Sequence, residues 1–463
     1  MKRHIHFVGI GGIGMSGIAE LLLNLGYKVS GSDVSTSEIT NRLSDLGATI
    51  FEGHKESQVS GCDVVVISSA VKSDNPEVVS AKKQNIPVIP RAEMLAELMR
   101  MKEGIAIAGT HGKTTTTSIV STILAYADLD PTIVIGGKLN AIGSNARLGS
   151  GKYIVAEADE SDKSFLLLSP TIAVVTNIDL EHMDRYKNLD DIKSTFLTFL
   201  SRLPFTGLAV LCVDEPNVQS IIPKIEKRKI TYGTSPQADL RATNIKFEGL
   251  TTSFDCYQGK KHLGQVMIPM PGIHNVRNCL SAIAVAIEVG IDFPLISDAL
   301  KEFSGVQRRF TLKGERQEVM VFDDYGHHPT EIKATISAAR HSYPNKRIIA
   351  VFQPHRFTRT RDLFDEFLGS FNQADMLMLT DIYPASESPI AGVSGKSLQE
   401  GMIAQGYKNV HFCAKREQIP QALWPHLKKH DIVITLGAGD IVKTGPEILK
   451  FIEKNGLSNE QTN

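Results

Sequence analysis

Gly104-Ile-Ala-Ile-Ala-Gly-Thr-His-Gly-Lys-Thr-Thr-Thr-Thr117 joins a short apolar run to a glycine-containing turn and a row of threonines. Residues 105–108 predict a buried strand, and Lys113 opens a segment that predicts a helix through Ala127. A strand, a glycine turn, Lys-Thr and a helix form the layout of a phosphate-binding loop. Backbone N–H groups and the positive end of the helix dipole then face an oxyanion. We therefore expect this stretch to bind a nucleoside triphosphate.

The loop is shorter than the general phosphate-binding motif. That motif has a further glycine five positions before Gly112, where this chain has Ile107. The alternative is a simple glycine turn with a surface lysine, but the apolar strand directly upstream favours the phosphate loop. In that loop Lys113 would reach β- and γ-phosphate oxygens, and the Thr114 hydroxyl would ligate Mg²⁺.

Length and composition indicate a multidomain globular protein. A chain of 463 residues is too long for one core, so we expect two to four domains. The net charge of −1 creates no field that would attract nucleic acid or an anionic membrane. The five cysteines are scattered with no Cys-x-x-Cys pair, which fits the reducing cytoplasm. No apolar run approaches the roughly 20 residues of a membrane span, so we expect no membrane insertion.

The N-terminal region has a second glycine turn. A strand pattern at residues 4–8 leads into Gly9-Ile-Gly-Gly-Ile-Gly14, an apolar helix at 18–25 and a second strand that ends near Asp33. This is the dinucleotide-binding fingerprint, and by itself it suggests NAD. The same turn is also a general pyrophosphate seat that would suit a UDP-sugar, and its glycines could serve helix packing alone. These three interpretations remain open from the residues themselves.

Two polar segments follow strands in the central region. The strand predicted at 153–156 ends in Glu157-Ala-Asp-Glu-Ser-Asp162, and crowded carboxylates near a phosphate loop favour Mg²⁺, with Glu157 as the first candidate ligand. A solvated acidic turn is the alternative. His182 follows a strand at 172–176 and could be a metal ligand, a proton carrier or a structural residue. Asn278, near the start of a helix expected at 279–289, could pair with an adenine edge or act as a helix cap.

The C-terminal region alternates strands and helices from about residue 319. This pattern predicts a doubly wound parallel sheet with ligands at the carboxyl ends of its strands. One strand end carries Gln353-Pro-His-Arg-Phe-Thr-Arg359, in which Arg356 and Arg359 share a helical face and suit a carboxylate or phosphate. Helices are expected at 331–340 and 363–371.

The ordered set of these motifs closely resembles the Mur ligases, the ATP-dependent amide-forming enzymes of peptidoglycan synthesis. The motifs that carry the resemblance are Gly109-Thr-His-Gly-Lys-Thr-Thr115, Glu157-Ala-Asp-Glu-Ser-Asp162, His182-Met-Asp184, His274-Asn275 with Asn278, Arg308-Arg-Phe310 and Asp323-Asp-Tyr-Gly-His-His-Pro329. The opening Gly9-Ile-Gly-Gly-Ile-Gly-Met-Ser16 and His355-Arg-Phe-Thr-Arg-Thr360 point to the branch of the family that uses L-alanine.

The resemblance implies an α/β fold of three domains. A Rossmann-like UDP-sugar domain would span residues 1–102, and a central P-loop ATPase-like domain with a mostly parallel sheet would span 103–306. A C-terminal Rossmann-like, doubly wound domain at 307–463 would bind the amino acid and close the site. The implied reaction is ATP-dependent ligation of L-alanine to the lactyl carboxylate of UDP-N-acetylmuramate through an acyl phosphate. The alternative is a murein-recycling ligase that attaches a tripeptide, and the oligomeric state would be monomer or homodimer.

The resemblance also implies roles for individual residues. Lys113, Glu157, His182 and Arg309 would be catalytic, and Mg²⁺ would be bound by Thr114, Glu157 and His182. ATP would be held by Gly109, Thr110, His111, Gly112, Lys113, Thr114, Thr115, Asn275, Asn278 and Arg309. The substrates would be bound by Gly11, Gly12, Gly14, Met15, Ser16, Asp33, Ser69, His355, Arg356 and Arg359. Some Mur ligases carry a carbamylated lysine where this chain has Leu197, and Lys193 is not assigned that role.

Overall fold

The computed structural model describes residues 3–68, 70–135, 146–183 and 185–457. The chain separates into two compact units. The first comprises Met1–Ile245, Phe254–Met267 and Val276–Val306, and the second comprises Lys246–Ser253, Ile268–Asn275 and Gln307–Asn463. Within the described ranges, no helix has the length and apolar character needed to cross a membrane.

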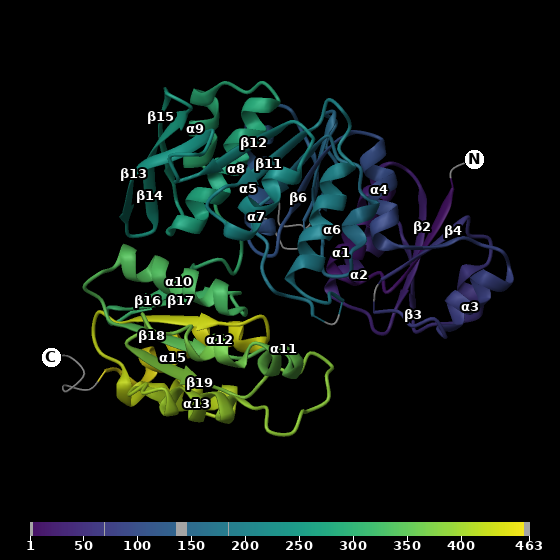
Figure 1. The fold of residues 1–463 in the computed structure, drawn as a ribbon. Helices are drawn as coiled ribbons and strands as arrows, with labels where there is room; N and C mark the ends of the chain where they lie inside the picture. The colour runs from purple at the N-terminus through teal and green to yellow at the C-terminus, as the bar shows by residue number, and fades with distance from the viewer. Residues whose placement is uncertain (1–2, 69, 136–145, 184, 458–463) are drawn as a thin grey trace. The chain divides into compact units, whose positions relative to one another are not determined.

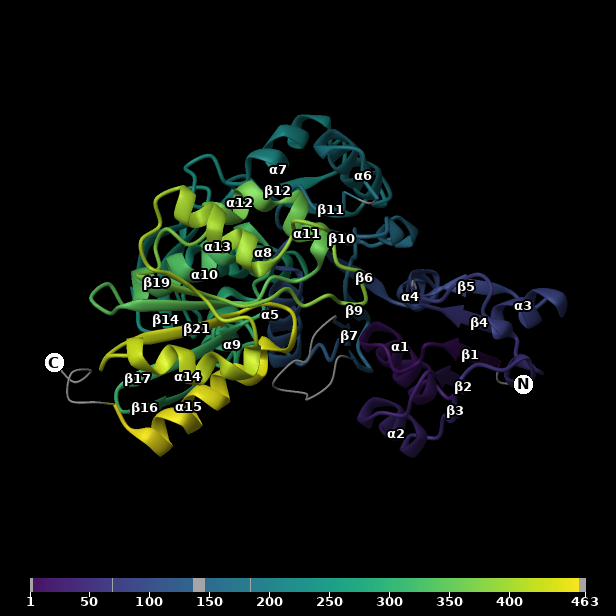
Figure 2. The same ribbon diagram turned by 90° about the horizontal axis from the view of Figure 1, so that it is seen from below.

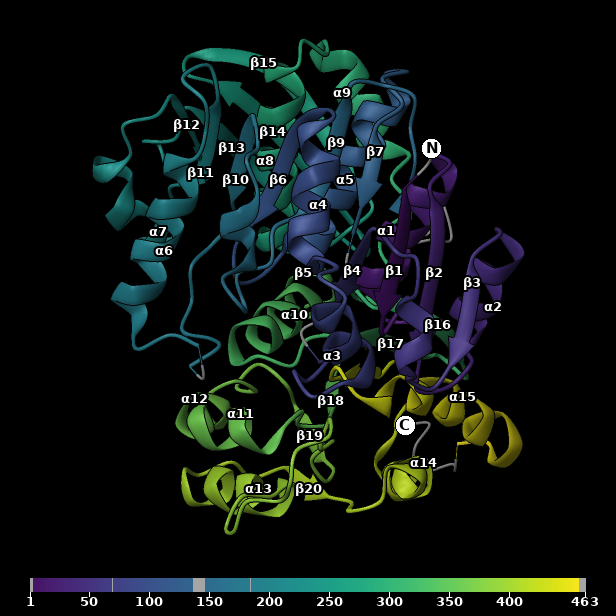
Figure 3. The ribbon, with the colours of Figure 1, turned by 90° about the vertical axis from the view of Figure 1, so that its right-hand side faces the viewer.

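The N-terminal part of the first unit is a five-stranded parallel sheet in the order β3-β2-β1-β4-β5 (Figure 3). This order places the first glycine turn at the central strand, where a Rossmann-like sheet binds its ligand. The strands are β1 (His4–Val8), β2 (Lys28–Asp33), β3 (Thr49–Glu52), β4 (Val64–Ile67) and β5 (Val88–Pro90).

Helices cover both faces of this sheet. Apolar residues of α1 (Ile13–Asn24), α2 (Glu38–Asp45) and α4 (Arg91–Arg100) pack into one buried cluster. The opposite face packs against α3 (Pro76–Lys83) and the short 3-10 helix η1 (Glu56–Val59). Helix α1 begins five residues earlier than its apolar periodicity predicts, because the glycines of the turn already enter its first turn.

The central part of the first unit is built around β6 (Glu103–Ala108), the strand of the quoted stretch (Figure 1). It lies between β10 (Ile172–Val175) and β9 (Tyr153–Glu157), and both pairings are parallel. The full ten-strand order is β15-β14-β13-β12-β11-β10-β6-β9-β7-β8. The other strands are β7 (Thr132–Val134), β8 (Ala146–Arg147), β11 (Leu208–Cys212), β12 (Lys229–Gly233), β13 (Leu240–Glu248), β14 (Thr251–Gln258) and β15 (Lys261–Ile268).

The sequence predicted two helices of this part, α5 and α8, and only the start of α8 differs. Helix α8 (Ile273–Glu288) begins six residues before the expected Cys279, so Asn278 lies in its second turn and not at its start. The first turns of α8 are polar, and apolar periodicity therefore underestimates its length. The remaining helical segments are α5 (Lys113–Tyr126), α6 (Leu189–Ser201), α7 (Pro216–Ile221), α9 (Phe293–Lys301), η2 (Ser164–Leu167) and η3 (Ile222–Lys224).

The second unit holds a six-stranded sheet in the order β16-β17-β21-β18-β19-β20. Its pairings are parallel except for the antiparallel edge pair β16–β17, an edge strand that alternation did not predict. The strands are β16 (Thr311–Arg316), β17 (Val319–Asp324), β18 (Ile348–Phe352), β19 (Met376–Leu379), β20 (Val410–Phe412) and β21 (Ile432–Leu436).

Alternate residues of these strands enter two separate cores, as a doubly wound sheet requires. Helices α10 (Pro329–Ser342), α12 (Phe364–Leu368) and α13 (Gly395–Ala404) cover one face, and α14 (Ile419–Leu423) and α15 (Thr444–Asn455) cover the other (Figure 2). The helix expected at 363–371 is present as α12, which ends at Leu368, and α11 (Phe357–Asp362) is a separate helix before it that was not predicted. Short 3-10 turns are η4 (Arg416–Gln418), η5 (Trp424–His426) and η6 (Asp440–Lys443). The predicted three-part α/β fold is confirmed.

Candidate functional site

The turn between β6 and α5 has the backbone shape of a phosphate-binding loop. Gly109 has φ 132° and Gly112 has φ 83°, a region that favours glycine. A Cβ at Gly109 would overlap the Thr176 hydroxyl, and one at Gly112 would lie 2.8 Å from the Asn278 side-chain oxygen. Both glycines are therefore needed for conformation and for space.

The loop that follows β10 holds the phosphate-loop backbone in place. The His111 N–H donates to the side-chain oxygen of Asn177 at 2.8 Å, and the Thr176 hydroxyl donates to the His111 carbonyl at 2.6 Å. The Asp179 N–H donates to the Thr110 hydroxyl at 2.9 Å. These bonds fix the turn at the carboxyl ends of two neighbouring parallel strands, where α/β sheets bind ligands.

Lys113 is the first residue of α5, and its ammonium is held tightly. Its Nζ donates to both carboxylate oxygens of Glu160, at 2.9 and 3.0 Å, and to the Gly109 carbonyl at 2.6 Å. The Glu160 side chain is only 2% exposed. Burial alone would lower the pKa of Lys113, but the carboxylates of Glu160 and Asp159 outweigh it and raise the pKa above its ordinary value. The ammonium therefore stays charged, as a phosphate-binding group must.

Glu160 is a functional candidate that sequence reasoning missed. The residue belongs to the acidic run after β9, but the run offers four carboxylates and the periodicity does not show which one turns toward Lys113. The hydroxyl of buried Tyr186 donates to the Glu160 carbonyl at 2.5 Å. The His182 Nε2 lies 3.8 Å from Oε1 of Glu160 and 3.8 Å from Oε2 of Glu181. The loop after β10 thus brings an imidazole to two acids.

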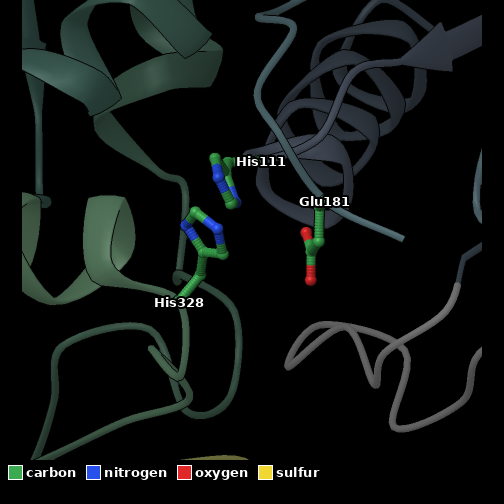
Figure 4. A group of neighbouring side chains, drawn as sticks. All are labelled: His111, Glu181 and His328. Atoms are coloured by element: carbon green, nitrogen blue, oxygen red, sulfur yellow. The ribbon is translucent and has the colours of Figure 1, made fainter. Parts of the chain in front are cut away.

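The donor set around the phosphate loop fits a hard divalent cation. Carboxylate and hydroxyl oxygens are the ligands that Mg²⁺ prefers, whereas an imidazole nitrogen is a less usual ligand for this ion. His111 and Glu181 place ligand-type atoms within 4.8 Å of each other (Figure 4). The third residue drawn there, His328, belongs to the second unit, where its side chain accepts from the Thr330 N–H at the start of α10. Predicted ligand Glu157 is the last residue of β9, and Thr114 lies in the first turn of α5.

The first glycine turn opens onto a cleft of about 660 Å³. The Gly11 N–H donates to Asp33 Oδ2 at 2.8 Å, and a Cβ at Gly11 would lie 2.9 Å from the same oxygen. Three of the predicted substrate residues, Gly11, Gly12 and Asp33, line this cleft. Other lining residues are His54, from the segment after β3, and Ser68, Lys72 and Asn75, from the segment between β4 and α3. No role was predicted for these residues, because no motif links the two segments to the glycine turn.

The other predicted substrate residues of the N-terminal region that the structure describes do not line this cleft. The Met15 side chain is 2% exposed within the hydrophobic core, and Ser16 is 5% exposed, so these residues face inward from α1. A Cβ at Gly14 would lie 3.1 Å from the guanidinium of Arg91, whose Nη2 is 3.8 Å from Asp159 Oδ2. Arg91 therefore extends from the start of α1 to the acidic loop near Lys113. Predicted Ser69 lies outside the described residues.

The second unit gathers its predicted residues at the carboxyl ends of β17 and β18. The ring of His355 stacks on that of Tyr383 with centroids 5.5 Å apart, and its Nδ1 is 3.4 Å from Nη1 of Arg359. Arg356 has a φ of 71°, and its backbone N–H donates a hydrogen bond to the Tyr383 carbonyl. Burial, His327 and the two arginines lower the pKa of His355 to about 4.

Arg309 and Asn275 also belong to the second unit. The Arg309 guanidinium lies over the Tyr325 ring at 5.5 Å, with Nη1 3.7 Å from Glu331 Oε1. The Asn275 amide donates to the Pro271 carbonyl at 2.8 Å. By contrast Asn278, in the first unit, has its amide against Gly112 of the phosphate loop.

Three family models cover most of the chain. They are the Mur ligase family catalytic domain at residues 4–103, the Mur ligase middle domain at 107–286 and the Mur ligase glutamate ligase domain at 308–439. The chain belongs to the Mur ligase family. The UDP-N-acetylmuramate–L-alanine ligase of Pelobacter propionicus is a 58% identical relative over 451 residues, which cover 97% of this chain and 98% of the relative.

Two solved Mur ligase structures are also similar. The UDP-N-acetylmuramate-alanine ligase MurC of Thermotoga maritima matches with a TM-score of 0.81 at 28% identity, over 97% of this chain and 99% of that one. The murein peptide ligase of Psychrobacter arcticus matches with a TM-score of 0.69 at 25% identity, over 97% and 98%. The resemblance that the sequence predicted is therefore confirmed at the level of family and fold.

In this Mur ligase the structure brings the phosphate loop, Asn278, Glu160 and His182 into one neighbourhood of the first unit. It places the glycine-turn cleft on the N-terminal sheet of the same unit. His355, Arg356 and Arg359 form a separate cluster in the second unit. The roles assigned to individual residues remain predictions.

Proposed function

We propose that this Mur ligase joins L-alanine to the lactyl carboxylate of UDP-N-acetylmuramate while ATP is converted to ADP and phosphate. The observation that carries this proposal is the 58% identity, over almost the whole chain, to a relative named for that reaction. The phosphate-loop geometry with its charged Lys113 supports ATP as the energy source. The product would enter peptidoglycan synthesis, and with it cell-wall formation, cell shape and division.

The chemistry explains why ATP is needed. A carboxylate is a poor acyl donor, because its oxygen leaves badly. The lactyl carboxylate attacks the γ-phosphorus of ATP, ADP departs, and an acyl phosphate forms. The amine of L-alanine then attacks the carbonyl carbon, phosphate leaves, and a proton is lost from nitrogen as the amide forms. The protein's contribution to the first step is positioning and charge stabilisation.

The phosphate loop would perform that positioning. Backbone N–H groups from Gly112 to Thr115 would surround the phosphates, while those of Thr110 and His111 are bonded to Asn177. The Lys113 ammonium would neutralise charge on the β- and γ-oxygens. Asn278 lies against Gly112 and is suited to the nucleoside end of ATP, with Asn275 assigned to the same group. Because Glu160 holds the Lys113 ammonium, it sets the position from which that charge acts.

Mg²⁺ is the metal this donor set suits. Thr114 would hold one ion, and Glu157 with His182 would hold a second, with Glu160 an additional acid beside His182. When bound, Mg²⁺ would offset the negative charge of the triphosphate.

The sugar nucleotide would occupy the glycine-turn cleft. Gly11, Gly12 and Gly14 would face its pyrophosphate at the start of α1, whose dipole favours an anion. Met15 and Ser16, which face inward from α1, would support this turn from within the domain. Asp33 and Ser69 would complete this site. From the second unit, Arg309 is assigned to the γ-phosphate, and His355, Arg356 and Arg359 to the muramyl and alanine end.

We also propose how the enzyme is divided into domains and where it acts. The three functional domains would be residues 1–102, 103–306 and 307–463. We propose a cytoplasmic enzyme, monomeric or homodimeric, whose partners are its small-molecule substrates.

Phosphate release with ATP, UDP-N-acetylmuramate and one acceptor at a time tests this function. We expect turnover with L-alanine and far less with L-alanyl-γ-D-glutamyl-diaminopimelate, the acceptor of the alternative recycling ligase. Preference for the tripeptide would replace the proposal with that alternative. Lys113→Ala should abolish phosphate release while leaving UDP-N-acetylmuramate binding nearly intact, and retained turnover would remove Lys113 from the mechanism.

A further inference from the structure

A buried carboxylate lies beneath the glycine-turn cleft. Glu77, on α3, has a side chain that is 0% exposed. Its Oε1 accepts from His6 Nε2 at 2.8 Å, and its Oε2 accepts from the Ser32 hydroxyl at 2.7 Å and from His54 Nδ1 at 2.7 Å. The four residues come from α3, β1, β2 and the segment after β3, so the fold assembles them across the whole N-terminal sheet.

Glu77 is held in its ionised form. Burial by itself raises the pKa of this carboxyl group, but hydrogen bonds from His6, Ser32 and His54 outweigh it and bring the pKa below the ordinary value. An ionised carboxylate can only accept hydrogen bonds. Each of its three partners must therefore present a hydrogen to it, since a buried charge without such donors would be costly.

This requirement fixes the tautomer of both histidines. His6 directs Nε2–H at Glu77, and its Nδ1 faces the Ser30 hydroxyl at 2.7 Å. His54 directs its Nδ1–H at Glu77. In the neutral ring the other nitrogen, Nε2, then carries no hydrogen and can accept a hydrogen bond. The histidines differ in access: the side chain of His6 is 0% exposed, whereas that of His54 is 22% exposed.

His54 also lines the cleft together with Gly11, Gly12 and Asp33. We propose that Glu77 is a positioning residue that holds His54 as the Nδ1–H tautomer, so that His54 Nε2 accepts a hydrogen bond from the nucleoside part of the sugar nucleotide. The donor is a ribose hydroxyl or the imide N–H of uracil, which offer the same chemistry. The inference depends on the proposed function, because it takes the cleft to be the sugar-nucleotide site.

The first experiment separates the two nitrogens of His54. His54→Asn keeps a side-chain amide N–H near the position of Nδ1 but removes Nε2, whereas His54→Gln places an amide oxygen or nitrogen near Nε2. Binding of UDP-N-acetylmuramate is measured by titration calorimetry. We expect His54→Asn to weaken binding about tenfold, the loss of one ligand hydrogen bond, and His54→Gln to recover part of it. Equal binding by wild type and His54→Asn would overturn the inference.

A double-mutant cycle tests whether Glu77 acts through His54. Glu77→Gln should weaken binding in the wild-type background but cause no further loss when His54 is already asparagine. Glu56→Gln is the matched control, because it makes the same chemical change at an exposed residue two positions after His54 and should leave binding unchanged. A purely structural role predicts a lower melting temperature with unchanged affinity in the folded protein, and that result would also overturn the inference. If Glu77→Gln does not fold, the His54 pair carries the test.

Analogues of UDP identify the donor. If the imide N–H is the partner, wild type should bind 3-methyl-UDP about tenfold more weakly than UDP, whereas His54→Asn should bind the two with equal affinity. If a ribose hydroxyl is the partner, the 2′- or 3′-deoxy analogue of UDP should give the same pair of results. The absence of such a pattern for all three analogues would contradict the assignment of Nε2. If wild type itself fails to bind UDP-N-acetylmuramate, the proposed function fails; if wild type binds and the His54 variants match it, only this inference fails.

Discussion

The ammonium of Lys113 lies 2.9 and 3.0 Å from the two carboxylate oxygens of Glu160. The pair joins the first residue of α5 to the acidic loop after β9, so the phosphate loop and the acids are parts of one structure. Because Glu160 is 2% exposed, neither charge can lose its partner without cost. The pair is thus both a structural element and the centre of the ATP site that we propose.

We expect the Lys113–Glu160 pair to show strong energetic coupling. Lys113→Met and Glu160→Gln should each lower the free energy of unfolding by about 3 kcal/mol, because each leaves the other group buried without its partner. The double variant should be less destabilised than the sum of the two by about 1–3 kcal/mol. Urea unfolding of the four proteins measures this, and strictly additive losses would contradict the coupling.

Gly112→Ala should damage ATP binding through a contact as well as through backbone strain. The new Cβ would lie 2.8 Å from the Asn278 side-chain oxygen at a position with φ 83°. Gly47→Ala is the matched control, since Gly47 has φ 101° but a Cβ there would meet no heavy atom of the described chain within 4 Å. We expect the KM for ATP to rise at least about tenfold for Gly112→Ala and little for Gly47→Ala. Similar KM values for both variants would show that the contact with Asn278 is unimportant.

Thr114 provides a test of the metal proposal. Thr114→Val removes the hydroxyl at nearly constant volume, so the Mg²⁺ concentration for half-maximal activity should rise about tenfold, while Thr114→Ser should stay close to wild type. Activity is measured as phosphate release across a Mg²⁺ titration. An unchanged Mg²⁺ requirement in Thr114→Val would exclude Thr114 as a ligand.

His355 should make stability depend on pH. Its pKa of about 4 in the folded protein lies below the ordinary 6.5, so between these values the unfolded chain binds more protons. The free energy of unfolding therefore falls as pH falls from 6.5 toward 4, by about 1–2 kcal/mol from this residue after allowance for solvent. His355→Gln should show a shallower fall in urea unfolding between pH 7.5 and 4.5. An identical slope in wild type and variant would contradict the lowered pKa.

The sequence predicted those parts of the fold whose pattern of residues lies within one short segment of the chain. The strand at β6, the turn with Gly109 and Gly112 and the start of α5 follow from an apolar run, glycines and a helix pattern within one short stretch. The hairpin strands β13 and β14 were missed, although their burial alternates residue by residue and Gly249 marks the turn between them. That period-two pattern was present in the sequence and could have been used.

Other parts depend on distant contacts that no local pattern contains. The choice of Glu160 over its neighbours depends on the path of the chain after β9, where Lys113 and Tyr186 approach from other elements. Likewise, Glu77 and His54 are 23 residues apart and meet only because α3 packs beneath the sheet. The types of residue in the sequence predicted the chemistry of the site. Which of the several acids and histidines lie in the site was decided by packing between distant segments.

The central claim is that the sugar-linked carboxylate becomes an acyl phosphate at the Lys113 loop. The direct measurement uses UDP-N-acetylmuramate with ¹⁸O in both oxygens of the lactyl carboxylate, together with ATP, L-alanine and the wild-type enzyme, followed by mass spectrometry of the products. We predict that one ¹⁸O atom appears in each released phosphate and one remains in the new amide. Release of unlabelled phosphate, or ¹⁸O in AMP in place of phosphate, would contradict the account.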